Sequence, residues 1–155
     1  MPEQLNKESS KADVARRTLA LVRHNPRRAL LIFRMANWLV LFTILMRFVS
    51  MPRALKFVSA PLRNGAGNID EKELASALDS LMSAGVFLFR PSCWKRAAIL
   101  HRYLALGGIE SRINFGLRKD DDGEMRGHAW LERSGRAILE TTAPDYKITY
   151  SFPAR

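Results

Sequence analysis

The feature that most constrains the fold is a change in hydrophobic periodicity after Gly107 and Gly108. Before these glycines, which are expected to end a helix in the left-handed conformation, apolar residues recur every three or four positions. After them, apolar and polar residues alternate from Ser111 to Arg118, which is typical of a half-buried strand. Helices followed by antiparallel strands predict an α+β fold.

The alternating part of the chain predicts a hairpin and a further strand. The hairpin strands are expected at 128–133 and 136–141, around Ser134-Gly135, and a final strand is expected at 147–152. The segment 119–124 is rich in charge and contains glycine, so it is expected to be a turn.

A helix is expected between Asp70 and Gly85. Asp70 and Glu73 form a capping-box-like pair at its start, and Gly85 closes it. Val86–Phe89 is a short apolar run that leads to the next helix. The apolar residues of the predicted helix are Leu74, Ala77, Leu78, Leu81 and Met82.

Positive charge is concentrated in the N-terminal part. Residues 1–63 carry 12 Lys and Arg against 3 Asp and Glu, a net of +9, whereas residues 64–155 carry 13 against 12, a net of +1. Residues 1–11 are polar and expected to be disordered, and 12–23 can form a short helix. The loop-like composition of 60–69 predicts a basic helical N-terminal region at 1–63 and a domain at 64–155.

The basic region contains an apolar helix. Asn25 and Pro26 signal its start, Ser50–Pro52 its end, and its apolar core runs from Met35 to Met46. This core is shorter than the roughly 20 residues of a membrane span, so a buried or interfacial helix is expected. Contact with a membrane surface is an open alternative but is not favoured. Nucleic-acid binding is not expected, because the arginines flank a continuous apolar surface and no binding signature accompanies them.

Cys93 is the single cysteine, which excludes an intramolecular disulfide and a cysteine-rich zinc site. No secretory signal is visible in the first 25 residues, and a cytoplasmic protein is expected, with peripheral membrane association as the alternative. No metal and no cofactor are expected.

Cys93 lies where a helix is expected to begin. The hydroxyl of Ser92 is expected to cap this helix by accepting a first-turn backbone N–H. The helix dipole and the free amides favour a thiolate, and Lys95 and Arg96 add positive charge nearby. A lone cysteine is nevertheless more often a small buried apolar residue than a nucleophile.

The search for a base is short, because the chain has 3 histidines. His101 lies eight residues beyond Cys93 on the same helix, about 12 Å along its axis, so it cannot reach the thiol and is expected on the helix surface. His24 belongs to the basic region. His128 alone lies on a predicted strand of the C-terminal domain.

Hairpin register then selects an acid. A three-residue loop at 133–135 would pair His128 with Glu140, with Cβ atoms about 5 Å apart. If the Cys93 helix packs on that face, the result is a Cys–His–Glu triad. A two-residue loop would shift the register by one and break this pairing. The alternative is a buried cysteine, a half-exposed histidine and a solvated glutamate.

Three motifs within residues 70–152 together resemble the transglutaminase-like cysteine protease superfamily. They are Pro-Ser-Cys before a helix, then Gly-Gly-Ile-Glu-Ser-Arg-Ile-Asn-Phe-Gly-Leu-Arg, then Gly-His-Ala-Trp-Leu-Glu with a hairpin to an acidic residue. More narrowly, they resemble the leader peptidases of lasso-peptide biosynthesis, the stand-alone peptidase half of the B protein. The resemblance implies a papain-like core in which the nucleophile begins a helix packed on an antiparallel sheet.

The resemblance also implies an activity and its partners. The activity is removal of the leader from a ribosomally made precursor peptide by a thiolate nucleophile. The partners are that precursor, a small leader-recognition protein and an ATP-dependent lasso cyclase. The net charge and apolar helix of residues 1–63 suggest docking to the recognition protein or to an acidic leader.

The motifs assign roles to individual residues. The nucleophile corresponds to Cys93, the histidine to His128 and the acid to Glu140, where the family more often has aspartate; Asp145 is the reserve acid.

Trp94 and Trp130 are candidates to line the site, although Trp130 is equally a core aromatic. Two other functions stay open. One is a transglutaminase-like hydrolase or amide-forming enzyme on another peptide, and the other is a catalytically inactive scaffold or membrane-surface protein.

Overall fold

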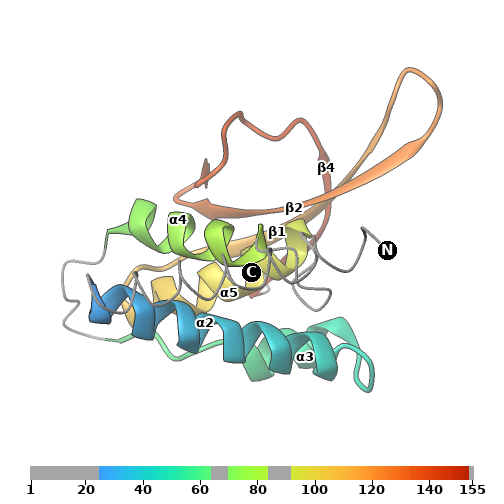
Figure 1. Ribbon diagram of the computed structural model, residues 1–155. Helices are drawn as coiled ribbons and strands as arrows, with labels where there is room; N and C mark the ends of the chain where they lie inside the picture. The colour runs from blue at the N-terminus through green and yellow to red at the C-terminus, as the bar shows by residue number, and fades with distance from the viewer. Residues whose placement is uncertain (1–24, 64–69, 84–91, 154–155) are drawn as a thin grey trace, which may run out of the picture.

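The computed structural model describes residues 25–63, 70–83 and 92–153. In this part of the chain the helices come first and the strands follow, so the fold is α+β, as the change in periodicity predicts (Figure 1). The predicted helix at 12–23 and the apolar run at 86–89 lie outside the described residues. The helices are α2 (Pro26–Leu45), α3 (Met51–Val58), α4 (Glu71–Met82) and α5 (Cys93–Leu106), and the strands are β1 (Arg112–Lys119), β2 (Met125–Arg133), β3 (Arg136–Ile138) and β4 (Lys147–Phe152).

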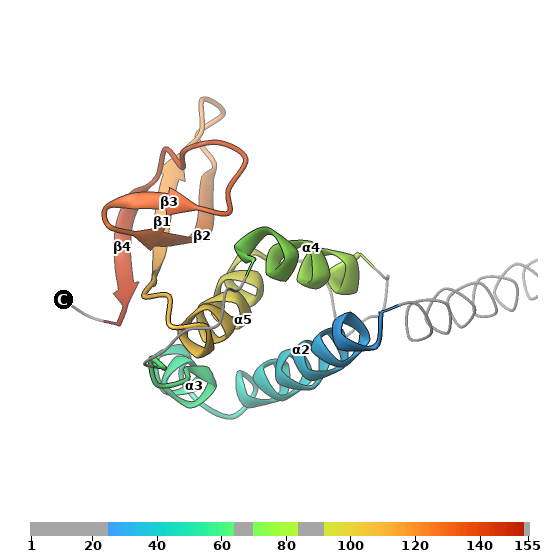
Figure 2. The same ribbon diagram turned by 90° about the vertical axis from the view of Figure 1, so that its left-hand side faces the viewer.

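The strands form one antiparallel sheet in the order β3-β2-β1-β4. Figure 2 shows this sheet to one side of the helices, with α5 the helix beside it. α5 contacts β1 and β2, and it also contacts α2, α3 and α4. The helix that begins at Cys93 is therefore the central element, and it packs against the strand that carries His128.

One hydrophobic cluster joins the helices to the sheet. The division of the chain at residue 63 stays a prediction, but the described helices on both sides of it bury their apolar faces together. The largest fully buried side chains of this cluster are Met35, Leu39, Phe42, Leu55, Leu78, Ile99, Leu100, Leu104, Ile113 and Leu131.

α2 buries one face and exposes the other. Its start is as predicted, because the Asn25 side chain accepts a hydrogen bond from the Arg28 N–H at 3.2 Å and Pro26 lies in the first turn. Met35, Leu39 and Phe42 are fully buried. Over its full 20 residues the helix is long and apolar enough to cross a membrane, unlike the shorter run considered above. The buried side chains of Met35, Leu39 and Phe42 nevertheless pack α2 against α4 and α5.

The predicted helix end at 50–52 is only partly correct. α2 ends at Leu45, but a second helix, α3, begins at Met51. Pro52 lies in its first turn, where a missing N–H removes no intrahelical hydrogen bond. α3 adds Ala54, Leu55 and Val58 to the core.

α4 begins as predicted. The Asp70 side chain accepts hydrogen bonds from the backbone N–H groups of Lys72 and Glu73, at 2.9 and 3.3 Å. Of the predicted apolar residues, Leu81 is half-buried. The others are buried in the structure: Leu74, Ala77, Leu78 and Met82.

α5 begins at Cys93 and ends before Gly107, and Gly108 has a left-handed φ of 75°, as predicted. The predicted role of Ser92 is wrong. Ser92 occupies the N-cap position, but its side chain makes no capping hydrogen bond. Its hydroxyl oxygen is buried without a hydrogen-bond partner in the described residues.

The prediction that His101 lies on the helix surface is also wrong. The residue is 8% exposed, and its Nδ1 lies 3.0 Å from the Ser111 hydroxyl. Its ring meets the Phe152 ring edge-on. Because burial disfavours the charged imidazolium, it lowers the pKa of His101. The β strands that follow α5 therefore cover this face of the helix.

The loop between β2 and β3 is shorter than predicted. Arg133 pairs with Arg136, which leaves a two-residue loop of Ser134 and Gly135. Their φ angles of 50° and 78° are those of a type I′ turn, whose twist matches the flanking strands. The predicted three-residue loop is therefore wrong, and the register is shifted by one residue.

Candidate active site

His128 and Glu140 meet despite the shifted register. Continued past β3, the observed pairing would place Glu140 opposite Ala129, on the other face of the sheet from His128. Instead β3 ends at Ile138, and Leu139 adopts a left-handed φ of 58°. This turn brings Glu140 Oε2 to 3.3 Å from His128 Nε2. The left-handed backbone costs a residue such as leucine about 1–3 kcal/mol, which the surrounding contacts must offset.

Arg96 holds the segment after β3 in place. It lies one turn beyond Cys93 on α5, and its Nη1 donates to the Leu139 carbonyl at 3.1 Å. The same nitrogen lies 3.6 Å from Glu140 Oε1. Its Nε and Nη2 bind the two carboxylate oxygens of Asp79 on α4, at 2.7 and 3.1 Å, and this interaction raises the pKa of Arg96. Arg96 thus joins the cysteine helix to the acid.

The positive side chains near Cys93 are engaged elsewhere. Lys95 is 8% exposed, its Nζ lies 5.4 Å from the centre of the Trp94 ring, and burial lowers the pKa of Lys95. The charge of Arg96 faces Asp79 and Glu140. The N-terminus of α5 therefore remains as a source of positive potential at the thiol.

Two aromatic rings orient the His128 imidazole. The imidazole stacks on the Trp130 ring with centroids 6.0 Å apart, and the Tyr146 ring lies 5.3 Å away. Gly116, which pairs with His128 on β1, leaves room for both rings. A Cβ at this position would lie 2.7 Å from Tyr146 Cβ and 3.0 Å from the Trp130 ring. The close approach requires a residue without a side chain.

The geometry leaves one imidazole nitrogen for the thiol. Cys93 is a half-buried free thiol at the start of the helix that packs on β2. Because Glu140 occupies Nε2, His128 can offer only Nδ1 to Cys93. Within the described residues no hydrogen bond joins the thiol to this ring. Contacts of this kind often tighten only when a substrate is bound.

The structure places the other predicted site residues in different surroundings. Asp145 is exposed and makes no hydrogen bond to His128 in the described part of the chain. The Trp94 ring packs edge-on against Phe42, with centroids 5.5 Å apart. Trp130 is 4% exposed beside His128. Substrate contact by the two tryptophans stays a prediction.

The sequence did not reveal the roles of Arg96, Leu139 or Tyr146. Arg96 was visible only as a charge three residues after the cysteine, a spacing that any helix contains. A left-handed leucine leaves no signal in a sequence, because glycine and asparagine are the residues that favour this conformation. Among the described residues there is also no group of three metal-binding side chains.

The helix that begins at Cys93 packs on the strand whose histidine pairs with a carboxylate, and this arrangement defines a candidate site for thiol-based acyl transfer. A family model described as the transglutaminase-like superfamily matches residues 38–151, well over half of the chain. The protein therefore belongs to the transglutaminase-like superfamily, which generally comprises cysteine-type hydrolases and transferases. The match begins within α2 and ends within β4. No curated protein and no solved structure matches the chain.

Proposed function

We propose that this protein is a cysteine peptidase that removes the leader from a lasso-peptide precursor. The observation that carries the proposal is the contact of Glu140 with His128, which lies on the strand against which the Cys93 helix packs. Membership of the superfamily supports thiol chemistry on an amide. The motif Gly-His-Ala-Trp-Leu-Glu, together with the other two sequence motifs, supports the narrower assignment to a leader peptidase.

The first half of the proposed reaction is acylation. The Cys93 thiol gives its proton to His128 Nδ1, and the sulfur attacks the carbonyl carbon of the last leader residue. Backbone N–H groups at the start of α5, including that of Cys93, stabilise the oxyanion. His128 then protonates the leaving nitrogen as the C–N bond breaks. Glu140 holds the ring and stabilises the imidazolium.

The second half is deacylation. His128 removes a proton from water, and the oxygen attacks the thioester carbon. The C–S bond breaks, the leader leaves as a carboxylic acid and the thiol is restored. The freed peptide would pass to the ATP-dependent cyclase. A reducing cytoplasm would keep the single cysteine in the thiol form that this reaction needs.

A second candidate is acyl transfer to an amine. The superfamily match covers transferases as well as hydrolases. The same thioester would then be attacked by an amine of another peptide, and a new amide would replace the carboxylic acid. A catalytically inactive scaffold is the third reading, and it predicts no thioester at all.

Mass spectrometry of the products distinguishes these functions. We would incubate the protein with a candidate precursor and a candidate small leader-recognition protein. The wild type is expected to release a leader fragment with a free carboxylate, and Cys93→Ala is expected to release none. A leader fragment carrying an amide would favour the transferase. A precursor that stays intact with the wild type as well as with Cys93→Ala would overturn the peptidase assignment.

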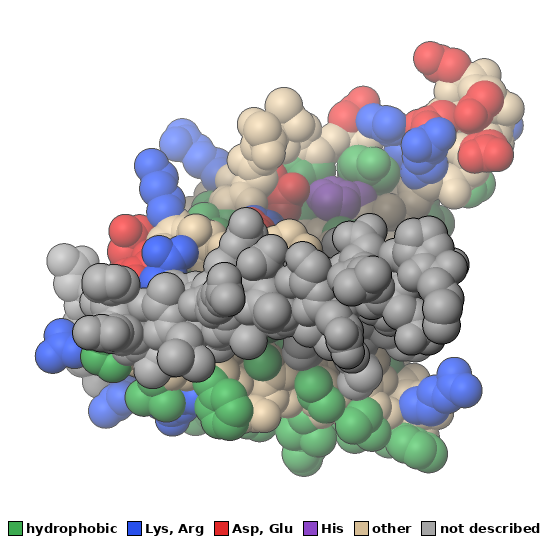
Figure 3. All heavy atoms as spheres, in the orientation of Figure 1, with side chains coloured by type: hydrophobic (Ala, Val, Ile, Leu, Met, Phe, Trp, Pro, Cys, Tyr) green, Lys and Arg blue, Asp and Glu red, His purple; other side chains and the backbone are tan. Residues whose placement is uncertain are grey.

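We also propose where the recognition protein docks. Figure 3 shows hydrophobic side chains along the lower edge of the molecule, where α2 and α3 lie in Figure 1. Contiguous exposed apolar surface of this kind commonly marks an interaction site. We call it the apolar face, and its exposed side chains are Leu30, Phe33, Leu41, Ile44, Phe48 and Phe57.

Introducing charge on the apolar face should weaken partner binding. Phe33 and Phe48 are 63% and 79% exposed, so Phe33→Asp/Phe48→Asp should fold normally. Its affinity for the recognition protein is expected to fall by about 10-fold or more, measured by calorimetry. Met125→Asp, at a position 62% exposed on β2, is the matched control. If the affinity for the recognition protein is unchanged, and the wild type binds anionic lipid vesicles whereas the double variant does not, the result would instead favour contact of the apolar face with a membrane surface.

A further inference from the structure

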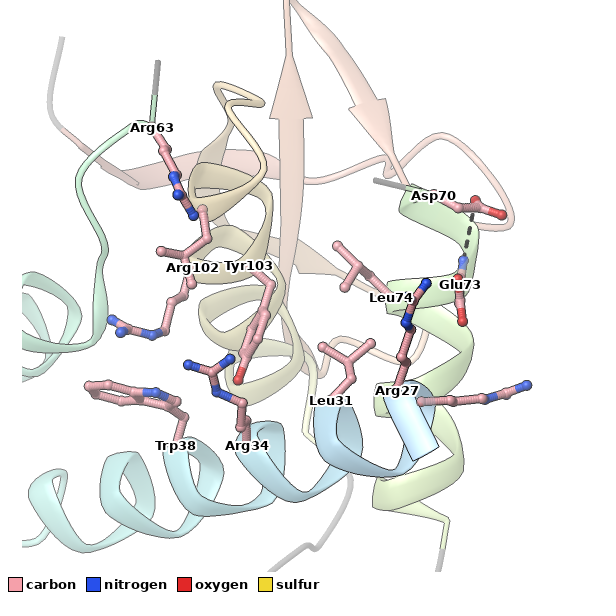
Figure 4. A pocket seen from close by; sticks show the side chains of 12 residues that line it. Arg27, Leu31, Arg34, Trp38, Arg63, Asp70, Glu73, Leu74, Arg102 and Tyr103 are labelled. Carbon is pink, nitrogen blue, oxygen red and sulfur yellow. Dashed lines mark hydrogen bonds between the residues drawn. The ribbon is translucent and has the colours of Figure 1, made fainter. Parts of the chain in front are cut away.

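A pocket of about 440 Å³ lies between α2, α4 and α5, away from the start of α5 (Figure 4). Its wall combines guanidinium groups with leucine and aromatic side chains. Figure 4 shows that the labelled arginines come from three parts of the fold: α2, the segment after α3, and α5. The arginines that line it are Arg27, Arg28 and Arg34 of α2, Arg63 after α3, and Arg102 of α5.

Positive charge exceeds negative charge in this pocket. Among the described residues that line the pocket, only Asp70 and Glu73 are acidic. Against the five arginines they leave an excess of three positive charges. Asp70 already caps α4. In the described residues no ion pair neutralises the five arginines. Burial is the main cause that lowers the pKa of Arg102; the Tyr103 hydroxyl raises this pKa, and repulsion from the charge of Arg34 lowers it by a smaller amount. An anion in the pocket would relieve this repulsion.

One guanidinium group of the pocket is held in place by contacts with the protein, and two others are free to bind a ligand. The Arg102 guanidinium lies 3.5 Å from the centre of the Trp38 ring and donates to the Val58 carbonyl at 2.7 Å. Arg34 and Arg63 are exposed, and their side chains make no hydrogen bond in the described part of the chain. A held cation beside two free ones is suited to bind carboxylates, because a guanidinium can donate two parallel hydrogen bonds.

Size and lining identify the kind of ligand. A water molecule takes up about 30 Å³ in the liquid, so a pocket of about 440 Å³ holds much more than one small inorganic anion. Leu31, Leu74 and Leu106 offer contact to aliphatic groups. We propose that the pocket binds an acidic peptide segment in which carboxylate side chains alternate with apolar ones. This inference rests on the proposed function, because a leader peptidase acts on a peptide.

The position on α5 indicates how the segment relates to the thiol. Arg102 lies nine residues beyond Cys93, about 13 Å along the helix axis. An extended peptide needs at least about four residues to cover that distance. A segment held in the pocket would therefore bind the substrate to the enzyme without touching the reacting atoms.

Direct binding tests the proposal separately from catalysis. We would measure fluorescence anisotropy of a labelled peptide of alternating Glu and Leu with the full-length Cys93→Ala protein. Arg34→Gln/Arg63→Gln is expected to weaken binding by about 10-fold or more. Arg53→Gln/Arg136→Gln removes the same charge at exposed positions outside the pocket and should weaken it by less than about 3-fold. A peptide of alternating Lys and Leu should not bind.

Each of the remaining outcomes would overturn either the proposed peptide-binding pocket or the peptidase assignment, but not both. Equal weakening in the two double variants would show attraction by net charge only. Binding of inorganic phosphate without binding of the acidic peptide would replace the peptide with a phosphorylated ligand. Leader cleavage without peptide binding would overturn the pocket but not the peptidase. Peptide binding without leader cleavage would support the pocket and overturn the peptidase.

Discussion

Replacing His128 with alanine is expected to lower leader cleavage by about 10²- to 10⁴-fold, because one side chain is proposed to serve as base and acid. Cleavage would be followed by mass spectrometry under single-turnover conditions. Alkylation of Cys93 by iodoacetamide near neutral pH should also slow several-fold, since the thiol loses its proton acceptor. Alkylation requires no substrate, so it reports on the thiol even if the precursor is unknown.

The His128→Ala experiment needs a control for folding. The imidazole contacts Trp130 and Tyr146, so its removal should cost about 1–2 kcal/mol of unfolding free energy. Thermal unfolding would show whether the variant is folded at the assay temperature. Added imidazole should restore part of the lost cleavage if only a base is missing. Cleavage within 3-fold of the wild type would exclude His128 from the reaction.

Replacing Arg96 with methionine is expected to lower cleavage by about 10- to 100-fold, although Arg96 is not proposed to touch the substrate. The variant loses the contacts with Asp79, the Leu139 carbonyl and Glu140, so the left-handed turn is no longer held and the acid can leave His128. Single-turnover cleavage as a function of pH is the measurement. Arg96→Lys should recover little, because an ammonium cannot reproduce the bidentate contact with Asp79.

A double-mutant cycle separates positioning from stability. If Arg96 acts through Glu140, the variant Arg96→Met/Glu140→Ala should be no slower than Glu140→Ala alone. Arg133→Met is the matched control, because Arg133 also joins the sheet to α4, through Glu71 at 2.9 Å, but outside the site. Additive losses, or an equal loss in Arg133→Met, would reduce Arg96 to a structural residue.

The helix and strand boundaries were largely predictable because local signals determine them. The caps at Asn25 and Asp70 accept hydrogen bonds from the first turn, and Gly108 supplies the left-handed end of α5. The strand 147–152 follows from alternation alone. α3 was missed because Ser50–Pro52 was interpreted as the end of the preceding helix, although a serine at the N-cap and a proline in the first turn also signal a helix start.

The contact between His128 and Glu140 was predicted correctly, but the predicted hairpin pairing that was to produce it was wrong. Glu140 meets His128, but through a left-handed Leu139 after a two-residue loop rather than by pairing across a three-residue loop. Hairpin loops of two and three residues share the same glycine signal, so the sequence cannot separate them. His101 was misplaced for a related reason: helical spacing does not say which strands will cover a face.

By itself, the sequence determined the order of helices and strands, the start of α5 at Cys93 and the presence of one histidine on a strand that follows α5 in the chain. These follow from periodicity and caps, which act between neighbours in the chain. Only the tertiary structure decided that Arg96 joins Asp79, Leu139 and Glu140, and that five arginines surround one pocket. Such groupings depend on how separate elements pack, because the residues that meet are far apart in the chain.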